Sequence, residues 1–138
     1  DYGGDFIYAS TGFIYFTSSS YESRTDSLIN SPALVSISGP AFALNAVDVR
    51  NARDLKVTSS TKIQNAFGSL RKVVGNKALI DLSGFGLAIF DIGDTRPPTF
   101  NKLVRTEGGI YDIQGRGDRV FILSGPYGVK VIDLKRDS

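Results

Sequence analysis

Residues 119–134, RVFILSGPYGVKVIDL, consist of two apolar runs joined by a turn that contains glycine and proline. A related stretch, KALIDLSGFGLAIFDI, occurs at residues 77–92, and a weaker one, ALVSISGPAFALNAVDV, at residues 33–49. An aspartate near the end of each recurs at a regular interval, since Asp91 lies 43 residues after Asp48 and Asp133 lies 42 residues after Asp91. A unit that recurs every ~20–50 residues indicates a repeat architecture.

An interval of about 42 residues is typical of a four-stranded propeller blade. In the middle copy the sequence predicts strands at 70–74, 77–82, 87–92 and 99–106, with a tight turn at 75–76. The two central strands are continuously apolar, as expected when neighbouring sheets cover both faces. We therefore predict an all-β partial β-propeller of about three four-stranded blades, with a compact β-sandwich or barrel as the alternative.

The repeat register also predicts which side chains are buried. Residues at equivalent positions of the last two copies, Ile89 and Phe90 in one and Val131 and Ile132 in the other, are expected to lie in the core. Two segments, 41–56 and 64–74, fit a helical period about as well as a strand. The register decides against a helix in the first segment and leaves the second open, with a strand favoured.

The organisation of the chain follows from these copies. Residues 1–31 are expected to form a β-hairpin (5–10 with 13–18) and a serine-rich loop (18–31), before propeller-like repeats over residues 32–138. The repeats divide at about 32–66, 67–109 and 110–138. Further turns are expected at 38–40 and at 114–118, the latter about two residues longer than the turn at 75–76.

Composition limits the chemistry of the chain. Its 138 residues include no cysteine and no histidine, so thiolate chemistry, the commonest general base and the commonest metal ligand are missing. The net charge of +2 comes from interspersed basic and acidic residues, so no nucleic acid is expected. No apolar run reaches the roughly 20 residues of a membrane helix, so no membrane insertion is expected. Because the chain begins at Asp1, we expect a removed leader or a longer parent protein.

The stretches GVKVIDL (128–134) and GLAIFDI (86–92) resemble the core of LVIVD-type β-propeller repeats, in which a glycine precedes an apolar strand that ends in aspartate. Residues 91–98, DIGDTRPP, are similar to the polar, proline-containing turn that follows in that family. The copy that ends at Asp48 has neither the glycine nor the prolines. The resemblance implies a propeller of a secreted or cell-surface protein of bacteria or archaea, often without enzymatic activity, and it assigns no functional residue.

Three blades are too few to close a ring, because closed propellers use about 4–8. An open arc exposes apolar blade faces and strand edges to water. Burial of one such face contributes on the order of 10 kcal/mol before entropic costs. We therefore expect further blades of the parent protein or other protein chains to complete the assembly, with residues 5–18 supplying closing strands.

The tripeptide Arg116-Gly117-Asp118 resembles the integrin-binding motif, which presents a cation and a carboxylate on a loop tip so that the carboxylate can reach a receptor-bound metal. These residues are the candidate protein-binding site. The alternative, which we favour, is a hairpin loop that uses glycine and aspartate for their backbone angles.

The repeat aspartates are a candidate calcium site. Asp48, Asp91 and Asp133, with Asp94 and Asp137 nearby, could offer oxygen ligands at one end of the assembly. No segment has the spacing of a calcium-binding loop. We favour a role in capping turns, in which each carboxylate accepts a backbone N–H two residues on, and we expect no cofactor.

Three functions follow. The leading one is a non-catalytic propeller module of an extracellular or cell-surface protein, acting in binding or assembly. The second is a structural subunit of a surface layer or filament, built through contacts that do not close. The third is a propeller enzyme, a lyase or hydrolase with a channel site, for which Tyr111 with Arg105 or Arg119 is the pairing to test.

Overall fold

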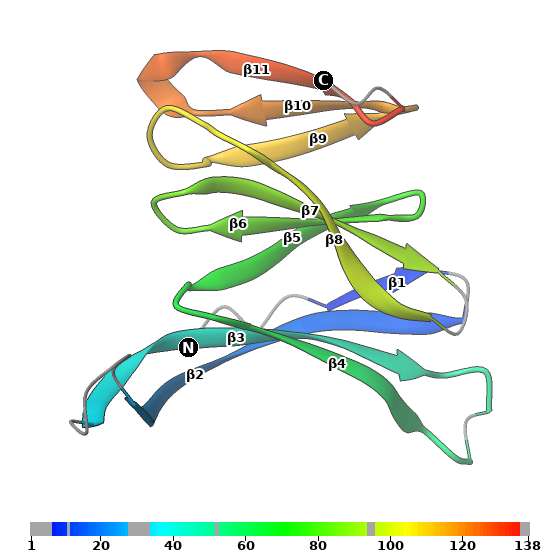
Figure 1. Cartoon of the computed structure of the whole chain (residues 1–138). Coiled ribbons are helices and arrows are strands. Elements are labelled where there is room, and N and C mark those ends of the chain that lie inside the picture. The colour runs from blue at the N-terminus through cyan, green and yellow to red at the C-terminus, as the bar shows by residue number, and fades with distance from the viewer. Residues whose placement is uncertain (1–6, 11, 28–33, 52, 94–95, 136–138) are drawn as a thin grey trace.

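The computed structural model describes residues 7–10, 12–27, 34–51, 53–93 and 96–135 (Figure 1). Within these ranges the regular elements are strands and one short 3-10 helix, which confirms the all-β prediction. The elements are β1 (Ile7–Ser10), β2 (Phe13–Ser27), β3 (Leu34–Asp48), β4 (Lys56–Gln64), β5 (Gly68–Val74), β6 (Lys77–Leu82), β7 (Gly86–Gly93), β8 (Arg96–Val104), β9 (Asp112–Arg116), β10 (Arg119–Leu123), η2 (Gly125–Tyr127) and β11 (Val129–Asp133).

The described strands form three antiparallel sheets, in each of which strands consecutive in the chain are neighbours. β1–β4 form the first sheet, β5–β8 the second, and β9–β11 a third sheet of three strands. Figure 1 shows the sheets stacked as layers, with β5–β8 in the middle. The described strands therefore make three open sheets rather than a closed barrel or a two-sheet sandwich. β1 and β2 pair with each other and with β3 in the first sheet, so within the described part of the chain they do not complete the last sheet. A closing role for residues 5–18 in an assembly stays a prediction.

The repeat aspartates occupy the same place in the three sheets, at or near the end of the third strand (β3, β7 and β11). In each sheet the residue after the aspartate donates its backbone N–H to the carbonyl of the residue that precedes the second strand. These bonds join Val49 to Gly12 (3.0 Å), Ile92 to Asn76 (2.9 Å) and Leu134 to Asp118 (2.7 Å). The interval in the sequence thus corresponds to a repeated backbone geometry.

Two-residue loops join β5 to β6 and β9 to β10. Their first residues, Gly75 and Gly117, have φ angles of 59° and 62°, which favour glycine. The tight turn predicted at 75–76 is confirmed. The longer connection predicted at 114–118 is wrong, because β9 continues to Arg116, which pairs directly with Arg119.

The glycine of the repeat motif permits the turn into the third strand. Gly86 and Gly128 have φ angles of 120° and 91°, and a Cβ on Gly86 would lie 2.3 Å from the carbonyl oxygen of Val104. The corresponding residue of the first copy is Ala43, and there β3 runs without interruption from Leu34 to Asp48. The turn predicted at 38–40 is therefore wrong.

Two layers of apolar side chains hold the stack together. The first lies between β1–β4 and β5–β8 and consists of Phe13, Tyr15, Phe42, Leu44, Ala46, Ala66, Leu70, Ala78, Ile80, Ala88, Phe90 and Ile92. The second lies between β5–β8 and β9–β11 and consists of Leu79, Leu87, Ile89, Ile110, Ile113, Val120, Ile122 and Ile132. Burial in these layers is the main stabilising contribution of the fold.

Strand β7 contributes to both layers. Because successive side chains of a strand point to opposite faces, Leu87 and Ile89 face β9–β11, whereas Ala88 and Phe90 face β1–β4. The prediction that neighbouring sheets cover both faces of this strand is confirmed. Burial of Ile89, Phe90 and Ile132 is also confirmed.

Sequence analysis missed two stretches of strand because their sequences are polar. β2 continues through most of the serine-rich segment predicted to be a loop, because β3 pairs with it along its whole length as far as Ser27 opposite Leu34. β4, KVTSSTKIQ, was not predicted; it is the edge strand of its sheet, and its side chains alternate between exposed and partly buried from Ser59 onward. The helix alternatives at 41–56 and 64–74 are wrong, since the described residues of both segments lie in strands, turns and irregular backbone.

Candidate functional site

One face of the third sheet is apolar and exposed. We call Phe121, Leu123, Val129 and Val131 of β10 and β11 the terminal face. Val129 and Val131 are 55% and 54% exposed, Leu123 is also exposed and Phe121 is half-buried. The prediction that Val131 is buried is wrong, because no described part of the chain covers this face.

The equivalent positions of the second sheet are fully buried. Leu87 and Ile89 lie 42 residues before Val129 and Val131 and are at most 1% exposed. The strand register supports the equivalence, because Leu79 pairs with Ile89 just as Phe121 pairs with Val131. The two faces therefore differ mainly in whether another sheet lies against them.

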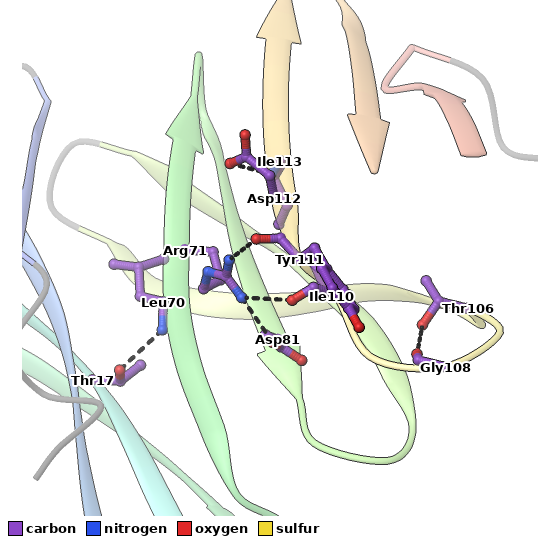
Figure 2. Close-up of polar contacts among 10 residues, drawn as sticks. All are labelled: Thr17, Leu70, Arg71, Asp81, Thr106, Gly108, Ile110, Tyr111, Asp112 and Ile113. Carbon is purple, nitrogen blue, oxygen red and sulfur yellow. Dashed lines mark hydrogen bonds and ion pairs between the residues drawn. The ribbon is translucent and has the colours of Figure 1, made fainter. Parts of the chain in front are cut away.

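Arg71 connects the second sheet to the segment that leads into the third (Figure 2). It sits at an irregularity of β5 between Leu70 and Lys72, where the pairing with β6 shifts by one residue. Such a bulge redirects a side chain. The guanidinium donates from Nη1 to Asp81 Oδ2 (3.0 Å) and to the carbonyl of Ile110 (3.3 Å), and from Nη2 to the carbonyl of Tyr111 (3.2 Å).

The carboxylate of Asp81 is partly removed from water beside Arg71. Burial raises the pKa of Asp81 above its ordinary value, and the charge and hydrogen bond of Arg71 act in the opposite direction. The pair is thus a half-buried link between strands and linker rather than a free surface ion pair. Sequence analysis did not single out Arg71, because its role depends on the bulge in β5, which a single sequence does not reveal.

Two tyrosines pack on glycines of opposing loops. A Cβ on Gly108 would lie 2.8 Å from the ring of Tyr127, and a Cβ on Gly125 would lie 2.8 Å from the ring of Tyr111. The linker of residues 105–111 and the loop of residues 124–128 therefore interlock through two ring-on-backbone contacts. Beside them lies an open cleft of about 540 Å³ whose lining includes Arg105, Glu107, Tyr127 and Lys130.

Tyr111 and Arg119, one of the pairs considered for catalysis, lie apart in the fold. The backbone N–H of Tyr111 bonds to the carbonyl of Leu123, at the end of β10 opposite Arg119. Four residues of strand separate these positions, or about 13 Å. Arg105 lines the cleft together with Tyr127 and not with Tyr111.

The tripeptide at residues 116–118 forms the tip of the β9–β10 hairpin. Arg116 and Asp118 are exposed, and Gly117 occupies the position that requires positive φ. Asp118 Oδ2 lies 3.3 Å from Lys135 Nζ in an exposed ion pair, which contributes little to stability. Its backbone carbonyl accepts the Leu134 bond described above, so the loop has a structural role, and binding of a protein by these residues stays a prediction.

The repeat aspartates accept hydrogen bonds from backbone N–H groups and from side chains, and they do not gather together. Asp48 and Asp133 each accept a backbone N–H two residues on, from Arg50 and Lys135, as predicted for turn-capping. Asp91 accepts side-chain bonds from Lys77 and Asn101. Within the described ranges no three acidic side chains gather into a metal site, and the predictions for Asp94 and Asp137 fall outside those ranges.

The side chain of Arg50 contacts both Asp48 and Phe13 at the turn that follows β3. It donates to both carboxylate oxygens of Asp48, at 2.9 and 2.7 Å, and lies 5.0 Å from the centre of the Phe13 ring. Its hydrogen bonds are the main reason that the pKa of Asp48 falls to about 2. Gly12 has a φ of 84°, which favours glycine, and a Cβ on it would lie 2.6 Å from the same arginine side chain, which would then have to shift.

Comparisons with known proteins identify no relative. No protein-family model matches the sequence, and no curated protein or solved structure shows significant similarity to it. In the described part of the chain, no helix has the length and hydrophobicity needed to cross a membrane.

Proposed function

We propose that this chain is a non-catalytic section of a β-propeller, belonging to a secreted or cell-surface protein, and that it acts in binding or assembly. The terminal face is the surface through which it does so. The extracellular or cell-surface location rests on the resemblance of GVKVIDL and GLAIFDI to LVIVD-type repeats.

The observation that carries the proposal is the contrast between Ile89 and Val131. Equivalent positions of successive sheets are covered in one case and exposed in the other. Exposed apolar patches on soluble proteins mark interaction sites. A face built to the same pattern as one that already receives a sheet is suited to receive another sheet of the same kind.

The alternative of a propeller enzyme has less support, because the backbone of Tyr111 bonds to Leu123, at the end of β10 opposite Arg119. The alternative of a layer or filament subunit uses the same terminal face, and it differs only in whether the resulting assembly closes. The test below addresses the face itself.

The experiment uses two copies of the chain joined by a flexible glycine–serine linker. Since the chain has no cysteine, Val131→Cys in the first copy introduces the only thiol. We expect a thiol reagent to label it at least about tenfold more slowly than a matched Ser83→Cys variant, because the second copy covers the terminal face. Ser83 is an exposed residue of the β6–β7 loop and is the control. Equal labelling rates for the two thiols would overturn the proposal.

A further inference from the structure

We infer that the cleft beside Tyr127 binds a carbohydrate that carries a carboxylate, such as a uronic acid residue of an acidic oligosaccharide. This site is distinct from the function proposed above and does not depend on the propeller. The volume of the cleft, about 540 Å³, lies in the range of ~300–1,000 Å³ that is typical of sites for small molecules.

Three connections at the same end of the strands form the walls of the cleft, at the left of the stack in Figure 1. The β6–β7 loop forms one wall with Phe85, and the linker after β8 forms a second with Arg105 and Glu107. The third sheet forms the remainder with Tyr127 and Lys130. The cleft therefore lies at the junction of the second and third sheets.

Two exposed aromatic rings line the cleft. Both Phe85 and Tyr127 are exposed, and the ring of Tyr127 packs on the backbone of Gly108, which fixes its position. The face of an aromatic ring is electron-rich and attracts the C–H groups on one side of a pyranose ring. Exposed rings that stand beside polar side chains are therefore suited to a sugar.

Three charged side chains line the same cleft. Arg105 and Lys130 supply two positive charges against the single negative charge of Glu107. Within the described part of the chain, none of the three forms an ion pair. A guanidinium binds a carboxylate through two parallel N–H···O bonds, and the carboxylate of Glu107 accepts hydrogen bonds from sugar hydroxyls. The lining therefore complements an anion that also carries hydroxyl groups.

The hydrogen-bonding groups of the lining favour a carboxylate over a phosphate. Phosphate sites are typically built from free backbone N–H groups at a glycine-rich loop or a helix N-terminus. Here the backbone N–H groups of Phe85, Tyr127 and Gly128 each donate to the carbonyl three residues earlier. The hydroxyl of the buried residue Ser124, by contrast, forms no hydrogen bond with any described residue, so a ligand hydroxyl can bond to it.

The walls of the cleft are held in place by bonds of their own. The backbone N–H of Ser124 donates to the carbonyl of Gly128 (2.9 Å), which closes the β10–β11 loop. The hydroxyl of Thr106 donates to the carbonyl of Gly108 (3.2 Å), and Arg71 holds the end of the linker. The site is thus formed before a ligand binds, as is usual for small-molecule sites.

Titration of the chain with an oligomer of galacturonic acid, followed by nitrogen-15 NMR, tests the inference. Amide signals of residues 84–85, 105–107 and 124–130 should shift together. Arg105→Gln should weaken binding at least about tenfold, because it removes the charge and the paired donors. Arg116→Gln removes the same charge at the tip of the β9–β10 hairpin, far from the cleft, and should leave the affinity unchanged.

The aromatic contact has its own pair of variants. Tyr127→Ala should weaken binding at least about threefold through loss of the stacking surface. Tyr21→Ala, at an exposed tyrosine of β2, should have no effect on binding. The amide spectrum of each variant shows that its fold is retained.

Three further ligands test the chemistry on the wild-type chain alone. An uncharged galactose oligomer, an oligomer of glutamate and adenosine monophosphate should each bind at least about tenfold more weakly than the galacturonic acid oligomer. Equal binding of any of them would overturn the inference, as the first would make the carboxylate unnecessary and the others would make the sugar unnecessary. Absence of shifts with the galacturonic acid oligomer, or shifts spread over basic residues outside the cleft, would also overturn it.

Discussion

The hydroxyl of Thr17, on β2, accepts the backbone N–H of Leu70, on β5, at 3.0 Å across the boundary between the first two sheets (Figure 2). Both residues are at most 1% exposed. β5 is the edge strand of its sheet, and this bond satisfies an N–H for which a neighbouring strand is not present on that side.

Thr17→Val should lower the free energy of unfolding by about 1–3 kcal/mol, because the substitution preserves shape but leaves the buried N–H of Leu70 without an acceptor. Urea unfolding measures the difference. Thr17→Ser keeps the hydroxyl and should recover part of the loss, and Thr99→Val, at an exposed position of β8, should be close to neutral. A Thr17→Val variant as stable as wild type would show that the bond is dispensable.

Phe90→Ala should cost about 3–5 kcal/mol of stability, since the side chain lies in the core between the first two sheets. Its edge-to-face partner Phe100, 5.6 Å away between ring centres, is 59% exposed. Phe100→Ala should cost only about 0.5–1.5 kcal/mol. Similar losses for the two variants in denaturant titrations would mean that Phe90 is not the buried member of the pair.

Gly86→Ala should destabilise the chain by about 1–3 kcal/mol. A φ of 120° is strained for alanine, and the added Cβ would clash with the carbonyl oxygen of Val104. Gly93→Ala, at the other end of the same strand, is the matched control. A Cβ at Gly93 meets nothing within 4 Å and its φ is not positive, so this variant should be close to neutral. Thermal unfolding of both variants compares them directly, and equal melting temperatures would contradict the argument.

The carboxyl of Asp81 should titrate above the range of an unfolded aspartate, and Arg71→Gln should raise its pKa further by removing a charge and a hydrogen bond that favour the ionised form. Carbon-detected NMR titration of the carboxyl group measures both values. A pKa that falls in Arg71→Gln would contradict the assignment.

The same shift has a consequence for stability. A raised pKa in the folded state means that Asp81 binds a proton more readily when folded than when unfolded. Its contribution to the free energy of unfolding therefore decreases as the pH rises from the ordinary aspartate pKa, about 3.9, through the folded value. Asp81→Asn should remove this decrease, and urea unfolding at several pH values in that window tests it.

Sequence analysis located the strands whose side chains show a clear apolar pattern and end at a repeated aspartate. In β7 every position from Leu87 to Ile92 except Asp91 is apolar, because neighbouring sheets cover both faces, and the repeated aspartates fix its end. The turn at 75–76 was also predicted from the sequence, because Gly75 can adopt the positive φ that the turn requires.

The remaining features depend on partners that a single sequence does not display. The long pairing of β2 with β3 is made by backbone bonds, so serines occur in it as readily as apolar residues. Ile89 and Val131 have the same local pattern, and only the presence of a neighbouring sheet makes their exposure different. The role of Arg71 depends on a bulge in β5 and on the linker carbonyls that it meets.

The position of β7 between two cores bears on how the chain unfolds. The third sheet could separate by exposing a single apolar layer, and so could the first, but loss of β5–β8 would expose both layers at once. Local openings should therefore begin at either end of the stack, while amide protons of β7 exchange only when the whole chain opens. Neighbouring side chains of this one strand belong to different interfaces, so Ile89 reports on the upper junction and Phe90 on the lower one in Figure 1. We therefore expect the middle sheet to make unfolding cooperative.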